Sequence, residues 1–238
     1  MRKLFKLLSV VFVVLLVLTL SACKESKTKP VEIKLDKSAS KYGIKLSEKE
    51  DFSDAKDSFI ITPELNVKDS TFGYLNFKEA FKANGALNPS DLSFLAYTVN
   101  IKNDGSDTTN IKMNIKATIA TNGAEKALRI LIIQDGTVDE SNNITCKKGS
   151  LFLKNDGHGD EVVVEKLSEE AEKKAFYDSI KKEFYTDDDN YGSFLIENIG
   201  KNETSKITFF FWLEGWDEDC FNDIIGGNLG LQFTLSVE

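Results

Sequence analysis

ITFFFWLEGWDEDCFNDIIGGNLGLQFTLSVE, residues Ile207–Glu238, is the stretch that decides the fold. It opens with a nearly continuous apolar run, Ile207–Leu213, and closes with strict alternation of apolar and polar residues over Leu229–Glu238. Alternation with a period of two is typical of a β-strand with one buried face. A strand at this position must pair with residues that precede it, so the stretch predicts a β domain upstream.

Other segments show the same alternation. Two of them, Phe94–Lys102 and Ile111–Thr121, are separated by a short polar loop, and we expect them to form an antiparallel pair or a Greek-key step. Phe59–Val67 is predicted to be an edge strand because Pro63 interrupts it. We therefore predict an all-β fold, a jelly-roll-like β-sandwich that covers residues 43–238.

The short segment Phe77–Ala83 has helical spacing, which Gly85 could end. A longer segment departs from the β pattern. Over Ser168–Tyr185, apolar residues recur at spacings of three and four, which places them on one stripe of a helix. The residues of this stripe are Phe176, Tyr177, Ile180 and Phe184. We expect a single amphipathic helix, inserted in the sandwich sequence and lying on the domain.

The N-terminal residues have the three parts of an export signal. A basic start is followed by the apolar run Leu7–Leu20 and then by the short motif Leu20-Ser21-Ala22-Cys23. The motif resembles the lipobox of bacterial lipoproteins, which implies cleavage of residues 1–22 and attachment of acyl chains, palmitate among them, at Cys23. The alternative is an uncleaved transmembrane anchor, but the apolar run is shorter than the roughly 20 residues that a span needs. Both alternatives place the domain outside the cytoplasm.

The residues after the signal are polar and rich in lysine and serine. We expect residues 23–42 to be the lipidated cysteine and a flexible tether. Val31, Ile33 and Leu35 alternate with polar residues, so a first strand could begin there. Loss of residues 1–22, which contain three basic residues and no acidic one, would change the net charge from −8 to −11. Such an acidic domain is a poor partner for nucleic acid and for anionic lipid head groups, so the lipid anchor alone would hold it at the membrane.

Two cysteines remain once Cys23 is lipidated. An even pair in an exported domain favours a disulfide, so we predict a bond between Cys146 and Cys220. The alternative is that both side chains stay as thiols.

The residues that carry catalysis in common enzymes are sparse here. His158 is the single histidine and lies in a turn rich in glycine and aspartate, so neither a Ser-His-Asp triad nor a two-histidine zinc motif can be assembled. We therefore predict no catalytic residues. The run from Asp187 to Gly192 has some features of a calcium loop, with Asp187 and Asp189 as the candidate Ca²⁺ ligands. The alternative is a solvated acidic turn.

Two tryptophans lie four residues apart in the opening stretch. If Trp212 and Trp216 were exposed on one strand face, they would offer a stacking platform for a sugar. We favour the alternative that both belong to the core, because large aromatic residues are mostly buried.

The C-terminal stretch also carries a family resemblance. The run Phe211–Cys220, followed by Asn222-Asp223-Ile224, Gly226-Gly227 and the final alternating strand, resembles small exported Firmicute proteins similar to the TasA/camelysin group of matrix and surface proteins. The resemblance implies a jelly-roll-like sandwich. Two features depart from the group, since TasA-like proteins are not typically lipoproteins and no zinc-binding motif is present here. We carry over no functional residues.

These observations predict a lipid-anchored surface protein on the outer face of the bacterial cytoplasmic membrane. We expect it to act in binding or assembly, as a matrix, adhesion or envelope-associated component, and an unpaired edge strand is one route to protein partners or self-assembly. The alternative is a ligand-binding lipoprotein for a carbohydrate or peptide, with or without calcium. A third hypothesis is an extracellular hydrolase. The sequence identifies no ligand-binding residues.

Overall fold

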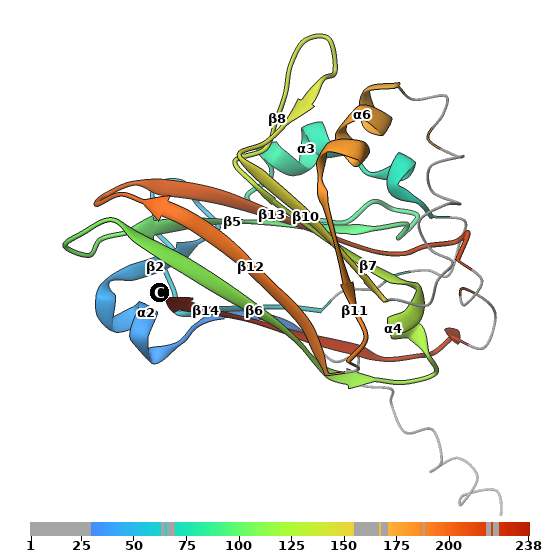
Figure 1. Ribbon diagram of the computed structural model, residues 1–238, viewed down its shortest axis with the longest axis horizontal. Helices are drawn as coiled ribbons and strands as arrows, with labels where there is room; N and C mark the ends of the chain where they lie inside the picture. The colour runs from blue at the N-terminus through green and yellow to red at the C-terminus, as the bar shows by residue number, and fades with distance from the viewer. Residues whose placement is uncertain are drawn as a thin grey trace, which may run out of the picture.

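The computed structural model describes residues 30–62, 65, 70–154, 167, 171–187, 189–217, 220 and 224–238. Two sheets face each other across an apolar core, and helices cover the outer face of one sheet (Figure 1). Among the described residues, the five-stranded sheet A has the order β12 (Asn190–Ile199), β6 (Thr109–Ala120), β14 (Leu229–Val237), β1 (Val31–Leu35), β3 (Ser58–Ile61). The predicted β-sandwich is confirmed.

The second sheet, sheet B, forms the middle layer. Among the described residues it contains, in order, β11 (Lys181–Tyr185), β10 (Lys148–Lys154), β7 (Leu128–Gln134), β13 (Thr204–Leu213), β5 (Leu95–Asn103), β2 (Ile44–Ser47), with β4 (Gly85–Leu87) also paired to β5. Most neighbours are antiparallel, but β1 is parallel to β14 and β10 is parallel to β11.

A group of short elements covers the outer face of sheet B, and we call it the cap. It consists of η1 (Phe72–Tyr74), α3 (Phe77–Lys82), α6 (Ala171–Ser179) and the hairpin of β8 (Thr137–Val138) and β9 (Ile144–Thr145). In Figure 1, α3, α6 and β8 lie together above β13 and β10. Sheet B therefore separates an inner core, between the sheets, from an outer core beneath the cap.

The two kinds of apolar pattern in the sequence correspond to the two sheets. In β14, Leu231, Phe233 and Leu235 face the inner core, while the alternate residues are less buried. In β13, Phe209 and Phe211 face the inner core and Phe210 faces the outer core. A strand with both faces buried has no polar side, which explains the continuous run at Ile207–Leu213.

The strand that the alternation of Val31, Ile33 and Leu35 allows is present, so the domain begins before the predicted bound at residue 43. Val31–Leu35 pairs in parallel with Leu231–Leu235 at the centre of sheet A, and α2 (Lys37–Tyr42) follows directly. The helix begins after Asp36, whose carboxylate accepts a hydrogen bond from the Ala39 backbone N–H at 2.8 Å. The predicted tether therefore ends before Val31, because the apolar side of the first strand is needed to continue the sheet.

The antiparallel pairing that we expected as one alternative for Phe94–Lys102 and Ile111–Thr121 is wrong. β5 and β6 are consecutive in sequence but belong to different sheets, so the polar loop between them crosses the sandwich. The two strands of the C-terminal stretch also separate, with β13 in sheet B and β14 in sheet A. Alternation shows which side of a strand is buried, but it does not show which neighbour the strand has.

The helix prediction was wrong in number and in length. The described residues contain α2, α3, α4 (Ala124–Ala127) and α6. The predicted amphipathic helix ends at Ser179, and the chain continues as β11, where Phe184 is 53% exposed instead of lying on an apolar helix stripe. None of the helices in the described ranges has the length and apolar character that a membrane crossing requires.

Several predictions concern residues outside the described ranges. They include the signal peptide, Cys23 and its lipobox, Pro63, His158 and the predicted N-terminus of the long helix at Ser168. The edge position of β3, predicted from Pro63, agrees with the order of sheet A.

Candidate binding surface

The cap is fixed to sheet B by aromatic packing. The Phe210 ring of β13 lies 5.1 Å from the Phe77 ring, 6.4 Å from the Phe81 ring and 6.2 Å from the Phe94 ring, measured between ring centroids. α3 is a short helix that begins after Asn76, whose side-chain oxygen accepts from the Glu79 backbone N–H at 3.1 Å. The burial of its two phenylalanines holds this helix over the sheet and so sets the shape of the surface above.

Open depressions surround α3 and the β8–β9 hairpin. Four of them have volumes of about 550, 570, 470 and 400 Å³. Neighbouring depressions share lining residues: Tyr74 and Asn76 line the first two, and Lys78 and Val138 line the second and the fourth. The depressions therefore form one extended surface, which we call the cap surface.

Tyr74 is the most prominent aromatic residue of the cap surface. Its side chain is 57% exposed and stands between the two largest of these depressions. Asn76 lines both depressions with it, Glu79 lines one, and Asn142 lines the other. An exposed ring beside amide and carboxylate groups can stack on an apolar sugar face while the polar groups bond to hydroxyls.

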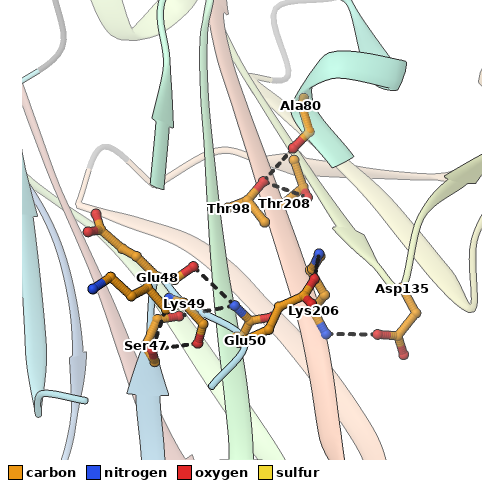
Figure 2. Close-up of polar contacts among 10 residues, drawn as sticks. Ser47, Glu48, Lys49, Glu50, Ala80, Thr98, Asp135, Lys206 and Thr208 are labelled. Carbon is orange, nitrogen blue, oxygen red and sulfur yellow. Dashed lines mark hydrogen bonds and ion pairs between the residues drawn. The ribbon is translucent and has the colours of Figure 1, made fainter. Parts of the chain in front are cut away.

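The opposite end of the cap is polar and hydrogen-bonded (Figure 2). The Thr98 hydroxyl donates to the Ala80 carbonyl at 2.8 Å and lies 3.0 Å from the Thr208 hydroxyl, which ties α3 to β5 and β13. The Lys206 ammonium contacts the Glu50 carboxylate at 2.7 Å, and the Lys206 backbone N–H donates to Asp135 at 2.8 Å. These charges are already engaged with one another, so this end offers little attraction to a ligand.

A buried ion pair lies beneath the cap. The Arg129 guanidinium and the Asp217 carboxylate form an ion pair at 2.5 Å, and each side chain is 1% exposed. Arg129 also donates to the backbone carbonyls of Lys126 and Leu128. Glu214 is fully buried nearby and accepts from the Trp212 indole N–H at 3.0 Å. Burial raises the pKa of Glu214 to about 7, despite the opposing effects of the Trp212 hydrogen bond and the Arg129 charge.

This buried group is structural in character. Glu214 and Asp217 are 0% and 5% exposed, so neither carboxyl group is open to a substrate. The hydroxyl of Ser70 is buried without a hydrogen-bond partner. Burial of these polar groups therefore costs free energy of desolvation, which the packing around them must offset.

The predicted disulfide is wrong. Cys146 and Cys220, both in the described ranges, do not bond to each other. Cys146 packs against the outer core and Cys220 against the inner core, and these two cores are on opposite faces of sheet B. Burial raises the pKa of the Cys146 thiol, which keeps it protonated and unreactive at neutral pH.

The candidate calcium ligands lie in the turn between β11 and β12. Both side chains are exposed, and the Asp187 carboxylate accepts from the Asp189 backbone N–H at 2.9 Å. Asp188 is outside the described residues. Within the described residues, no group of three or more histidine, cysteine, aspartate or glutamate side chains is close enough to hold a metal ion.

The aromatic residues of the sequence analysis divide into two kinds. Trp212 and Tyr191 are each 1% exposed, so the core prediction for Trp212 is confirmed. The Tyr191 ring stacks on Tyr185 with 3.9 Å between centroids. Trp216 is 40% exposed, so the core prediction for this residue is wrong: it follows β13 in a turn that leaves the sheet.

The sequence analysis missed Tyr74. Thr71–Phe77 has the aromatic composition of a strand, but it forms η1 and the start of α3, with Phe72 buried and Tyr74 facing outward. Asn76 as an N-cap was the available signal for a helix start.

Comparisons with known protein families, with curated proteins and with solved structures found no match to this chain. The resemblance to the TasA/camelysin group therefore stays a prediction from the C-terminal residues.

Proposed function

We propose that the protein is a lipid-anchored surface protein that acts by binding through the cap surface. The lipobox at Leu20–Cys23 supports the anchor and the location on the outer face of the membrane. The observation that carries the binding role is the extended cap surface, since linked open depressions suit a polymer or a macromolecule better than a small metabolite.

Binding is better supported than assembly by strand addition. The outer edge of β12 is blocked by lysines, because Lys148 donates to the Leu195 carbonyl at 2.9 Å and Lys147 to the Glu197 carbonyl at 3.4 Å. Lysines placed along an edge strand are a known protection against further pairing. β3, at the other edge of sheet A, has four residues, which is short for a stable added strand.

The cap surface favours a carbohydrate as the ligand. Tyr74 supplies the stacking ring, and Asn76, Glu79 and Asn142 supply hydrogen-bonding groups around it. The surface lies on rigid elements whose aromatic anchors are buried, so little ordering would be needed on binding. A peptide is the second candidate, because the linked depressions would also admit an extended chain.

Binding can be tested by co-sedimentation of the protein with insoluble cell-wall polysaccharide. We expect Tyr74→Ala to weaken binding about tenfold, which corresponds to the 1–1.5 kcal/mol of one aromatic contact, whereas Tyr74→Phe keeps the ring and most of the affinity. Phe184→Ala, which removes an exposed ring outside the cap surface, is the matched control. Equal binding by wild type and Tyr74→Ala would contradict a role for the cap surface.

The anchor is tested separately. Labelled palmitate should be incorporated by the wild type and not by Cys23→Ser, and the variant should leave the membrane fraction. Retention of the variant in the membrane fraction after high-salt washing, without label in either protein, would contradict lipidation.

A further inference from the structure

The sandwich has two unlike ends, and strand register assigns each residue to one of them. Val31 pairs with Leu231 and with Ile61, so the start of β1, the start of β14 and the end of β3 lie together. Leu231 in turn pairs with Ala117, close to the end of β6. We call this the anchor end, because Val31 is the first strand residue in the part of the chain that the structure describes. The C-terminus lies at the opposite, far end (Figure 1).

The same end of sheet B lies beside it. The Tyr185 hydroxyl, at the end of β11, donates to the Glu125 carbonyl of α4, which follows β6. Leu213, at the end of β13, pairs with Leu128, which directly follows α4. The anchor end therefore includes the ends of β6, β11 and β13 and the starts of β1, β7 and β14.

Exposed apolar side chains gather at the anchor end. The described residues include five large hydrophobic side chains that are exposed: Ile60, Tyr74, Phe184, Trp216 and Ile225. Tyr74 belongs to the cap surface and Ile60 lies near the middle of sheet A along the strand direction, and the other three are at the anchor end. Single exposed apolar residues are ordinary, but their concentration at one end of a molecule marks an interaction surface.

The register separates Ile60 from the other three residues. Ile60 pairs with Glu32, and Glu32 pairs with Gln232, the fourth of the nine residues of β14, so Ile60 is not at the anchor end. Phe184 is one residue from the end of β11. Trp216 is 40% exposed and follows the end of β13 by three residues.

Ile225 completes the group. It is 60% exposed, and its backbone carbonyl accepts from the Asn122 side chain at 3.4 Å, in the loop that follows β6. Phe184, Trp216 and Ile225 thus come from three separate connections or strand ends, and the fold places them at the same end of the sandwich.

The far end has a different character. There, the Asp104 carboxylate contacts the ammonium groups of Lys45 at 2.5 Å and Lys102 at 2.7 Å. Among the described residues, none of the exposed large hydrophobic side chains belongs to this end. The difference between the ends is what a molecule with one end on a membrane and the other in water requires.

The length of the tether sets how far the anchor end can be from the bilayer. This step rests on the lipid anchoring proposed above. Eight residue steps separate Cys23 from Val31, and they span at most about 28 Å when fully extended. A sandwich tied this closely is held at high local concentration beside the lipid surface, so a weak contact is enough to dock it.

We propose that the anchor end is a membrane-docking face, in which Trp216, Ile225 and Phe184 contact the interfacial region of the lipid bilayer. Tryptophan suits this region, where one part of the ring meets acyl chains and the indole N–H meets water. Asp187 and Asp189 are exposed at the same end, so apolar contact and not attraction to anionic lipid drives the docking.

The docking face is tested with the acylated protein in liposomes of neutral phosphatidylcholine that carries bromine on its acyl chains. Bromine quenches nearby indoles, and Trp212 is buried in the outer core, so we expect quenching that is lost in Trp216→Phe. Docking also predicts that a shift to anionic phosphatidylglycerol does not increase the quenching. Anchored protein whose Trp216 emission is unaffected by bromine would overturn the docking face.

A second measurement keeps the docking face and the anchor distinguishable. In the full mature chain with Cys23→Ser, we expect weak partition into neutral vesicles, lowered at least tenfold by Phe184→Ser, Trp216→Ser and Ile225→Ser together. Tyr74→Ser, which removes an exposed ring from the cap surface, should leave partition unchanged. Equal partition of the triple variant and its parent would overturn the docking face, whereas loss of palmitate labelling in the wild type would overturn only the anchor.

Discussion

Sheet A and sheet B differ in how many polar side chains their strands bury. Within the described residues, sheet A buries one polar strand residue, Thr109, whereas the strands of sheet B bury nine. These nine are Ser47, Thr98, Asn100, Asn103, Arg129, Gln134, Ser150, Ser205 and Thr208. A sheet with one wet face can turn its polar side chains to solvent, but a sheet covered on both faces has to satisfy them internally.

This difference indicates which substitutions should lower the free energy of unfolding most. Sheet A depends on apolar packing such as the contact between the Phe233 and Phe209 rings, at 5.0 Å between centroids. Sheet B also contains buried charged side chains that destabilise the fold when either partner is missing. The main example is the ion pair of Arg129 and Asp217. Such a pair adds little net stability, yet removal of one partner leaves an uncompensated buried charge.

The largest effect is expected from Arg129→Met. The change leaves the Asp217 carboxylate buried without its ion-pair partner, so the free energy of unfolding should fall by about 3–5 kcal/mol. Urea unfolding followed by circular dichroism measures it. Lys116→Met, on the exposed face of sheet A, is the matched control and should change stability by less than about 0.5 kcal/mol.

The double variant Arg129→Met with Asp217→Leu sharpens this comparison. Both charges are then removed, so most of the lost stability should return. A double variant as unstable as Arg129→Met alone would show that the contacts of the guanidinium with backbone carbonyls matter more than its charge.

The second effect is the pH dependence of stability that Glu214 contributes. Its pKa in the folded protein is raised from 4.5 to about 7, so the folded state holds the proton more tightly than the unfolded state. This contribution to stability is fully present below about pH 4.5, and up to about 3 kcal/mol is lost as the pH rises to about 7. The difference in unfolding free energy between wild type and Glu214→Gln, measured from pH 4.5 to 8, should show this slope.

Other carboxylates act at lower pH and with opposite sign. Hydrogen bonds from Lys102 and Lys45 lower the pKa of Asp104, so its stabilising contribution is lost as the pH falls below the ordinary range of an aspartate. The comparison with Glu214→Gln cancels such contributions. Parallel curves for the two proteins from pH 4.5 to 8 would mean that Glu214 is ionised in the folded state.

The smallest effect is expected from a reducing agent. Because Cys146 and Cys220 lie on different sides of sheet B, reductant should leave the Tm unchanged in a thermal scan. A bond that closes so long a loop would contribute roughly 4 kcal/mol, so its reduction would lower the Tm by several degrees. A fall of that size would place the two cysteines on the same side of the sheet.

The sequence indicated which residues of a strand are buried, but it did not indicate which strands pair with one another. The alternation in Leu229–Val237 and the apolar run in Ile207–Leu213 predicted strands, and β14 and β13 occupy these residues. Each pattern depends on one strand and its immediate surroundings. The pairing of β1 with β14 and the separation of β5 from β6 depend on residues far apart in the chain, and no local signal encodes them.

The candidate sites followed the same division. Trp212 and Trp216 have similar sequence surroundings, yet one lies inside a strand and the other in a turn beyond it, so exposure depends on where β13 ends. Phe184 fits a helical stripe only if α6 continues past Ser179, but β11 replaces the helix and turns this ring outward. The cap surface is built from three separate segments around Tyr74, which is why periodicity alone did not reveal it.

The central position of β14 has a consequence for how the chain folds. β14 joins β6 on one side to β1 on the other, so sheet A exists as two unconnected parts until the C-terminal strand is in place. Contacts between residues some 200 positions apart then have to form before sheet A is continuous, which favours slow folding. Until β14 is in place, the pair of β6 with β12 and the pair of β1 with β3 each have an unpaired edge, which is where another chain could add a strand.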